Sequence, residues 1–206
     1  GIILDWVPAH FPKDESGLYE FDGTCCYEGS DPLMNEHKEW NTRIFDYSRY
    51  EVISFLISSA VFWIREYHID GIRVDAVASM LYLDYDRTDG QWIANMYGGN
   101  ENLEAVEFLH HLSSIFRKKG AGAVLMAEET SYWPKATMTA EDGGLGFDYK
   151  WNHWWAEELF SFDGKWFAGS YAYRIGSFQD DVYFIIDYLT GTGSHFSIYR
   201  YNEKDG

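Results

Sequence analysis

The sequence has little cysteine, little positive charge and no long apolar run. Its 206 residues include only two cysteines, Cys25 and Cys26, and these are adjacent in the chain. Neighbouring cysteines rarely bridge, so we expect two free thiols, which are typical of a reducing compartment. No apolar run reaches the ~18 residues that a membrane-spanning helix needs. The sequence therefore predicts a globular protein of the cytoplasm and not a membrane protein.

Positive charge is outnumbered by negative charge. The chain has 16 lysine and arginine residues against 33 aspartate and glutamate residues, which gives a formal net charge of −17. A nucleic-acid-binding protein needs a basic surface, so this function is excluded, and an anionic membrane surface is disfavoured for the same reason. A neutral partner such as a sugar polymer is compatible with this charge. Aromatic residues make up 19% of the chain, and such rings stack well on sugars, although we expect most of them in the core.

Several common motifs are also missing. No glycine-rich nucleotide fingerprint or Walker sequence follows a predicted strand, and no G-x-S-x-G nucleophile elbow is present. The histidines at 110, 111, 153 and 195 do not have the spacing of a metal site. The sequence therefore favours neither nucleotide binding, nor serine-hydrolase chemistry, nor a metal centre.

Three short apolar segments, residues 1–7, 68–77 and 123–127, predict buried strands of a parallel sheet. Two segments with helical spacing, residues 50–67 and 101–118, separate these strands. The predicted apolar positions of the first helix are Val52, Phe55, Leu56, Ser59, Ala60, Phe62, Trp63 and Tyr67. Those of the second helix are Leu103, Val106, Phe108, Leu109, Leu112 and Phe116.

The loops of this predicted α/β fold are unequal in length. Long polar segments, residues 8–49 and 78–100, follow the first two strands, whereas the segments after the helices are short. This asymmetry is typical of a (β/α)₈ barrel, in which the functional site lies at the carboxyl ends of the strands. A doubly wound sheet follows the same rule and stays open as an alternative. A further helix is expected at residues 151–160.

Polar residues gather where the three predicted strands end. They are Asp5 with His10, Arg73 with Asp75, and Glu128 with Glu129. Because strand residues two apart point to the same face, Arg73 and Asp75 share a face, and the arginine favours the ionised form of the carboxylate. Glu128 supplies a second carboxyl group on another strand, and two carboxyl groups opposed across a sugar ring cleave a glycosidic bond.

Each of these groups also has a purely structural interpretation. Arg73 and Asp75 are compatible with an ion pair at a strand end, and Asp5 with His10 is compatible with a hydrogen bond that anchors a loop. Glu128 and Glu129 are compatible with a solvated strand end. The recurrence of polar residues at the same end of successive strands favours a functional site, but spacing alone does not identify a substrate.

Three segments resemble conserved regions of the α-amylase superfamily. They are Asp-Trp-Val-Pro-Ala-His at residues 5–10, Gly-Ile-Arg-Val-Asp-Ala-Val at 71–77, and Met-Ala-Glu-Glu at 126–129. Within the superfamily, the chain is most similar to the bacterial glycogen branching enzymes. This closer resemblance rests on residues 20–24, 40–42, 73–80, 97–105, 143–147 and 149–152.

The resemblance implies a role for each of five residues. Asp75 is expected to be the nucleophile that forms a covalent glucosyl intermediate, and Glu128 to be the proton donor and later the base. Arg73 is expected to orient Asp75 and keep it charged, His10 to hydrogen-bond the sugar in the cleavage subsite, and Asp5 to support the site. The implied reaction cuts an α-1,4-glucan and transfers the chain to a 6-hydroxyl, which forms an α-1,6 branch without a metal or cofactor.

The sequence also departs from the branching-enzyme pattern. The family carries a third essential aspartate in a His-Asp pair, and this chain contains no His-Asp dipeptide. We assign residues 1–160 to the central part of a (β/α)₈ barrel, about three strands with their helices, and residues 161–206 to a divergent tail. Because residue 1 already lies within a predicted strand, we expect the native start to lie upstream.

These departures leave three functional hypotheses. The first is a branching-enzyme segment that is incomplete and inactive by itself. The second is an α-amylase-type glycoside hydrolase, against which the branching-type loops argue. The third is a non-catalytic fragment that binds glucan.

Overall fold

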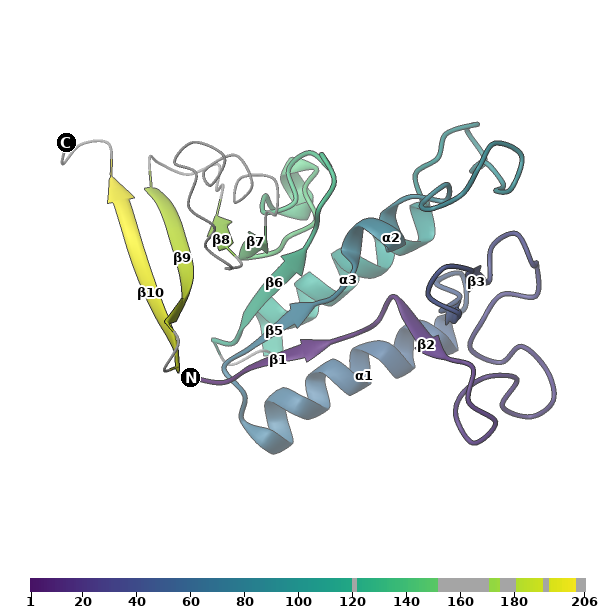
Figure 1. The fold of residues 1–206 in the computed structure, drawn as a ribbon, viewed down its shortest axis with the longest axis horizontal. Coiled ribbons are helices and arrows are strands. Elements are labelled where there is room, and N and C mark those ends of the chain that lie inside the picture. The colour runs from purple at the N-terminus through teal and green to yellow at the C-terminus, as the bar shows by residue number, and fades with distance from the viewer. Residues whose placement is uncertain (120–121, 152–170, 175–180, 191–192, 203–206) are drawn as a thin grey trace.

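The computed structural model describes residues 1–119 and 122–151, and the backbone of residues 171–174, 181–190 and 193–202 (Figure 1). Its main sheet has seven strands in the order β1-β5-β6-β7-β8-β9-β10. The first four strands are parallel: β1 (Ile3–Trp6), β5 (Gly71–Val74), β6 (Val124–Glu128) and β7 (Tyr149–Trp151). The last three continue the sheet antiparallel: β8 (Tyr171–Arg174), β9 (Asp181–Thr190) and β10 (Gly193–Asn202).

Helices connect the parallel strands. Helix α1 (Tyr50–Tyr67) lies between β1 and β5 in the chain, and α2 (Val77–Leu81) and α3 (Leu103–Lys119) lie between β5 and β6. The four parallel strands follow one another in chain order, whereas a doubly wound sheet reverses its strand order at a switch point. The predicted α/β class with a parallel sheet is therefore confirmed, and the arrangement is that of part of a (β/α)₈ barrel.

The two long helices were predicted to within two residues at each end. Helix α1 ends where His68 adopts a left-handed conformation, with φ of 53°, and its backbone N–H donates to the Ile64 carbonyl. In α3, the predicted core residues Phe108, Leu109 and Leu112 are fully buried. Phe116 is buried as well, at 6% exposed.

The buried face of α1 differs from the prediction. It consists of Val52, Leu56, Ile57, Ala60 and Ile64. Three aromatic residues predicted for this face are instead exposed: Phe55, Phe62 and Tyr67. The predicted apolar face was too wide. The buried residues follow a narrow stripe with i, i+4 spacing at positions 52, 56, 60 and 64.

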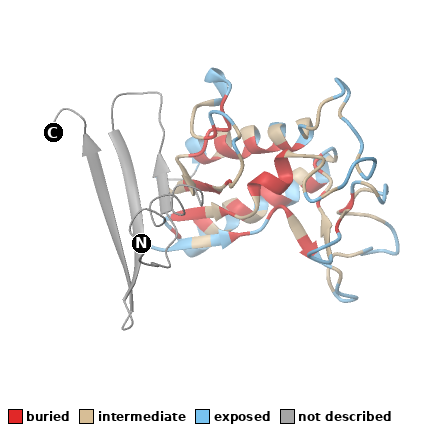
Figure 2. Cartoon of the chain, turned by 45° about the horizontal axis from the view of Figure 1, so that its top comes forward, coloured by how far each residue is buried: buried red, intermediate tan, exposed pale blue. Residues whose placement is uncertain are grey.

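The core lies between the parallel strands and these helices, where the buried residues gather in Figure 2. Ile72 and Val74 of β5 and Leu125 and Ala127 of β6 are at most 1% exposed. Gly71 lets β5 and β6 approach closely, because a Cβ there would lie 2.9 Å from the Val124 carbonyl oxygen and 2.5 Å from its Cγ2. The strands are thus held in register by packing as well as by hydrogen bonds.

Several short elements were not predicted. The loop expected at residues 8–49 contains a small antiparallel sheet of β2 (His10–Pro12), β4 (Thr42–Ile44) and β3 (Glu36–His37), and the loop expected from residue 78 begins with α2. These elements have two to five residues, too few for a periodic pattern. Trp151 belongs to strand β7 and not to a helix, while the rest of the helix predicted at 151–160 lies outside the described residues. Among the described residues, no helix has the length and apolar character needed to cross a membrane.

Candidate active site

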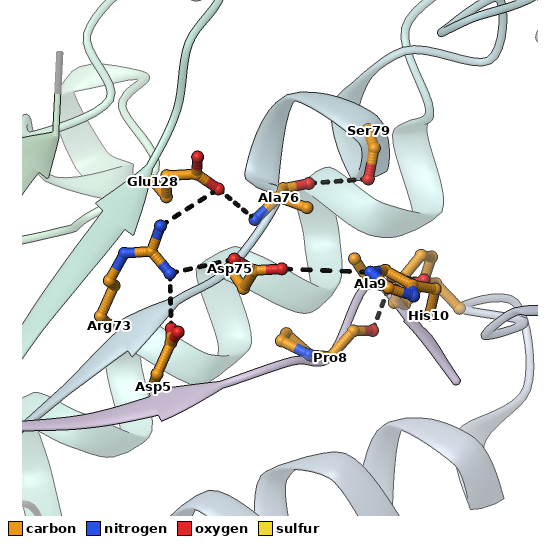
Figure 3. Close-up of polar contacts among 10 residues, drawn as sticks. Asp5, Pro8, Ala9, His10, Arg73, Asp75, Ala76, Ser79 and Glu128 are labelled. Atoms are coloured by element: carbon orange, nitrogen blue, oxygen red, sulfur yellow. Dashed lines mark hydrogen bonds and ion pairs between the residues drawn. The ribbon is translucent and has the colours of Figure 1, made fainter. Parts of the chain in front are cut away.

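Arg73 lies at the centre of a polar cluster at the carboxyl ends of three adjacent strands (Figure 3). Its Nη1 donates to Asp5 Oδ1 at 2.5 Å and to Asp75 Oδ1 at 2.9 Å, and its Nη2 lies 3.5 Å from Glu128 Oε2. Asp5 is paired with Arg73 in the β1–β5 register, and Glu128 ends β6. Because parallel strands bring their carboxyl ends to one edge, residues 123 positions apart in the chain share this cluster.

The charge of this cluster is dominated by carboxylates. Asp5, Asp75 and Glu128 surround the single guanidinium of Arg73. Burial lowers the pKa of Arg73, but the bonds to Asp5 and Asp75 and the charge of Glu128 outweigh it, so the pKa lies above its ordinary value. The guanidinium also lies 5.1 Å from the ring centroid of Trp151. Arg73 is therefore a permanent cation that contacts three carboxyl groups.

The turn after β5 places Asp75 and Glu128 beside each other. The Asp75 N–H donates to the Trp6 carbonyl at 2.9 Å, and the Ala76 N–H donates to Glu128 Oε2 at 2.8 Å. Ala76 is left-handed, with φ of 54°, and begins α2, where Ser79 Oγ donates to its carbonyl. A residue other than glycine is strained in the left-handed conformation. Such strain persists where the surrounding structure fixes the backbone, as it does at functional sites.

The two glutamates at the end of β6 point to opposite sides. The side chain of Glu128 is 18% exposed and faces Arg73, whereas Glu129 is fully buried. Glu129 accepts from the Ser131 N–H at 2.7 Å and pairs with the Lys150 ammonium, which also donates to the Ser131 carbonyl. Adjacent strand residues point to opposite faces, and here only Glu128 faces Arg73. The alternative of a solvated strand end does not hold for Glu129.

His10 approaches the cluster from β2. Its Nε2 lies 4.0 Å from Asp75 Oδ2, and burial lowers its pKa, although the charge of Asp75 partly opposes this effect. The chain before His10 is anchored by Tyr47, whose hydroxyl donates to the Pro8 carbonyl at 2.8 Å. Burial raises the pKa of Tyr47, so its hydroxyl remains a donor. His10 thus presents a neutral imidazole to the site near neutral pH.

All five predicted site residues therefore meet, namely Asp5, His10, Arg73, Asp75 and Glu128. Sequence reasoning missed Tyr47 and Lys150, which support the site from outside it. Lys150 could have been noticed because it lies between two aromatic residues, in a strand that the sequence analysis did not predict. A lysine in such a strand needs a carboxylate or carbonyl partner. Tyr47 gave no signal, since its partner carbonyls are 38 and 39 residues away.

No metal site accompanies this cluster in the part of the chain that the structure describes. In residues 1–119 and 122–151, no three histidine, cysteine, aspartate or glutamate side chains are placed to hold a metal ion. Cys25 and Cys26 are both free thiols, as predicted. The chemistry that the cluster can perform is that of two carboxyl groups on neighbouring strands, which is the arrangement that glycoside cleavage uses.

Comparisons with known proteins give a specific likeness. No family model matches the chain. It is 54% identical over 165 residues to the 1,4-α-glucan branching enzyme GlgB of Methylococcus capsulatus, a match that covers 80% of this chain and 22% of that protein. It is 50% identical over 204 residues to the 1,4-α-glucan branching enzyme GlgB 2 of Rhizobium etli, covering 99% of this chain and 26% of that protein. The chain thus spans about a quarter of the length of these curated relatives.

The extent of the two matches bears on residues 161–206. The Methylococcus match has 165 residues, whereas the Rhizobium match of 204 residues includes most of the segment that we set apart as divergent. Among solved structures, a maltogenic α-amylase from Thermotoga neapolitana has a TM-score of 0.48 and 15% sequence identity, over 80% of this chain and 31% of that one.

Proposed function

We propose that this chain carries the catalytic carboxylate pair of a 1,4-α-glucan branching enzyme. One observation supports this most strongly. Arg73 joins Asp75 and Glu128 at the ends of adjacent strands, within a sequence at least 50% identical to enzymes of that name. The proposed substrate is a neutral α-1,4-linked glucan, which the excess of carboxylates neither attracts nor repels.

In the first step, the Asp75 carboxylate attacks the anomeric carbon of an α-1,4-linked glucosyl unit. The bond between that carbon and the glycosidic oxygen breaks, and Glu128 donates its proton to the leaving oxygen. The product is a glucosyl ester on Asp75 and a shortened glucan with a free 4-hydroxyl.

In the second step, Glu128 acts as a base. Its carboxylate takes the proton of an acceptor 6-hydroxyl, and the hydroxyl oxygen attacks the anomeric carbon. The ester bond to Asp75 breaks, which forms an α-1,6 branch with retained configuration and returns both carboxyl groups to their starting states.

The neighbouring residues orient this pair. Arg73 contacts Asp75 and Glu128 through different nitrogens, so it fixes their relative position and places a positive charge beside the attacking carboxylate. The neutral imidazole of His10, 4.0 Å from Asp75, can donate to a sugar hydroxyl in the cleavage subsite. Asp5 supports Arg73 from the neighbouring strand.

The test uses the Rhizobium etli relative, because its match covers 99% of this chain. Residues 1–160, which we assign to the barrel, replace the matching segment of that enzyme, which keeps its own sequence downstream, and the chimera is assayed on amylose. The Asp75→Asn variant of the chimera should lose at least about 10⁴-fold in branching rate, since removal of a nucleophile abolishes the covalent step. The exposed Asp89→Asn serves as the matched control and should keep the rate. A rate of Asp75→Asn within tenfold of the unsubstituted chimera would contradict the proposal.

A further inference from the structure

Trp151 brings a fourth strand into contact with the carboxylate cluster. It is the last residue of β7, and the register of the two parallel strands pairs it with Glu128 of β6. Paired residues of neighbouring strands share a face of the sheet, and the next residue along a strand lies on the opposite face. Lys150 accordingly lies on that opposite face, where its ammonium pairs with Glu129. The indole of Trp151 is therefore on the side of the sheet that carries Glu128.

The indole ring contacts the guanidinium of Arg73. The Cζ atom of Arg73 lies over the ring of Trp151, 5.1 Å from its centroid. Arg73 belongs to β5 and Trp151 to β7, so the contact spans the intervening strand β6. Inward-pointing side chains of a (β/α)₈ barrel pack in layers drawn from alternate strands, which is the relation between β5 and β7. The contact is a cation–π interaction, for which tryptophan is the best aromatic partner.

The ion pairs of Arg73 lie at the outer end of its guanidinium. Nη1 donates to Asp5 and Asp75, and Nη2 lies near Glu128 (Figure 3). The Nε atom is buried and has no hydrogen-bond partner among the residues that the structure describes. The carboxyl groups therefore hold the guanidinium by one edge, whereas the ring of Trp151 contacts its flat side. Contact on the flat side limits the tilt of the plane.

Packing alone does not explain an indole at position 151. The Nε1 atom of Trp151 is buried, and it has no hydrogen-bond partner in the described part of the chain. Native proteins pair almost all of their buried donors, because an unpaired one is unfavourable. A phenylalanine or a methionine would fill space here without a buried N–H. What tryptophan adds is the π face that it presents to Arg73.

Through Arg73, this ring acts on both reacting groups. Arg73 contacts Asp75 and Glu128 through different nitrogens, so a tilted guanidinium would change the separation of the two carboxyl groups. A misplacement of about 1 Å can lower a rate about 10²-fold. We propose that Trp151 is a positioning residue, whose ring holds Arg73 in the orientation that sets Asp75 and Glu128 for reaction. This role rests on the proposed function.

The kinetic test compares side chains at position 151 of the chimera. Trp151→Met fills space without a π face and should lower kcat for branching at least about tenfold, while KM for amylose changes less than about threefold. Trp151→Phe restores a ring face and should have a kcat at least about threefold above that of Trp151→Met. Trp63→Met makes the same change in α1, where the ring of Trp63 contacts Phe62 and Tyr67, and should keep kcat. Rates are corrected for folded protein by circular dichroism.

A spectroscopic measurement on the 206-residue chain tests the contact without turnover. Protons that lie over an aromatic face are shifted upfield by the ring current. The side-chain proton resonances of Arg73, identified as those lost in Arg73→Lys, should therefore move downfield in Trp151→Met. They should stay in place in Trp63→Met. Arg73 resonances that do not move in Trp151→Met would overturn the contact.

Three kinetic results would overturn the positioning role. The first is a loss of kcat smaller than about tenfold in Trp151→Met, or one that Trp63→Met matches. The second is an equal loss in Trp151→Phe and Trp151→Met, which would mean that the π face does not matter. The third is a raised KM with unchanged kcat, which would indicate that the ring contacts the glucan directly. If Asp75→Asn abolishes branching but Trp151→Met does not lower it, the positioning role fails while the proposed function stands.

Discussion

The strand ends and the loops above them position their polar groups in different ways. At the strand ends, Arg73 and its carboxylates are fixed by the register of parallel strands, and each is paired within the cluster. In the loops, His37 is fixed by ring contacts and by the hydrogen bond from Arg87 to the Glu36 carbonyl, and its Nε2 has no hydrogen-bond partner among the residues that the structure describes. The comparison shows that strand register fixes the carboxylate cluster, whereas side-chain contacts between loops fix His37.

The sharpest test of the strand-end side compares its two neighbouring glutamates. In the chimera, Glu128→Gln should lower the branching rate by about 10³-fold or more, because the acid and the base of the reaction are both removed. Glu129→Gln should keep the rate within about tenfold per folded molecule, since Glu129 is buried on the other side. Initial rates of α-1,6 bond formation, corrected for folded protein, measure both. A larger loss in Glu129→Gln would reverse the assigned roles.

The same pair predicts a difference in stability. Lys150→Met leaves Glu129 as a buried charge without its ammonium partner and should lower the free energy of unfolding by about 3–5 kcal/mol. The double variant Glu129→Gln, Lys150→Met should recover most of this loss, because no charge is then left unpaired. Urea unfolding of the single and double variants measures the coupling. Additive losses would mean that the two residues do not act as a pair.

The loop side predicts a dependence on pH. Burial, and then repulsion from Arg87 and from the protonated form of His10, lower the pKa of His37 to about 4. The unfolded chain therefore binds a proton at this histidine below pH ~6.5 while the folded chain does not, so stability falls as the pH drops from about 6.5 to 4.

The lowered pKa of His37 should reduce the free energy of unfolding by about 3 kcal/mol over this pH range. The pKa of His10 is also lowered, and its effect on stability has the same sign. His37→Phe should remove the larger part of this loss. Urea unfolding at pH 7 and about pH 4.5 measures it for the unsubstituted chain and the variant. An equal loss in both would show that His37 is already charged in the folded protein.

The two sides also differ in how far the sequence predicted them. The Arg73–Asp75 contact follows from the two-residue period of a strand, which is a local property. The same period places Glu128 and Glu129 on opposite sides, but the choice of Glu128 came from the resemblance to the branching enzymes. Helices α1 and α3 were predicted because each has at least four turns of apolar periodicity. The exposed Phe55 and Phe62 show the limit of that signal, because apolar character does not say which side of a helix meets the sheet.

The loop elements could not be predicted in this way. Strands β2, β3 and β4 have two or three residues each and are stabilised by partners elsewhere in the loop. The bond from Arg87 to the Glu36 carbonyl spans 51 residues, and no local pattern announces it. Trp40 drew attention only as part of a motif, and its place beside His10 became visible in the fold.

The most direct test of the proposed function measures both possible products of one reaction. The chimera is incubated with amylose, and α-1,6 linkages and newly released reducing ends are counted in the same sample, with residues 1–206 alone and heat-killed chimera alongside. The proposal predicts many α-1,6 linkages with few reducing ends for the chimera, and no linkages for residues 1–206 alone, which contain no His-Asp pair. Reducing ends without α-1,6 linkages would show hydrolysis and contradict the transfer that we assign to Asp75 and Glu128.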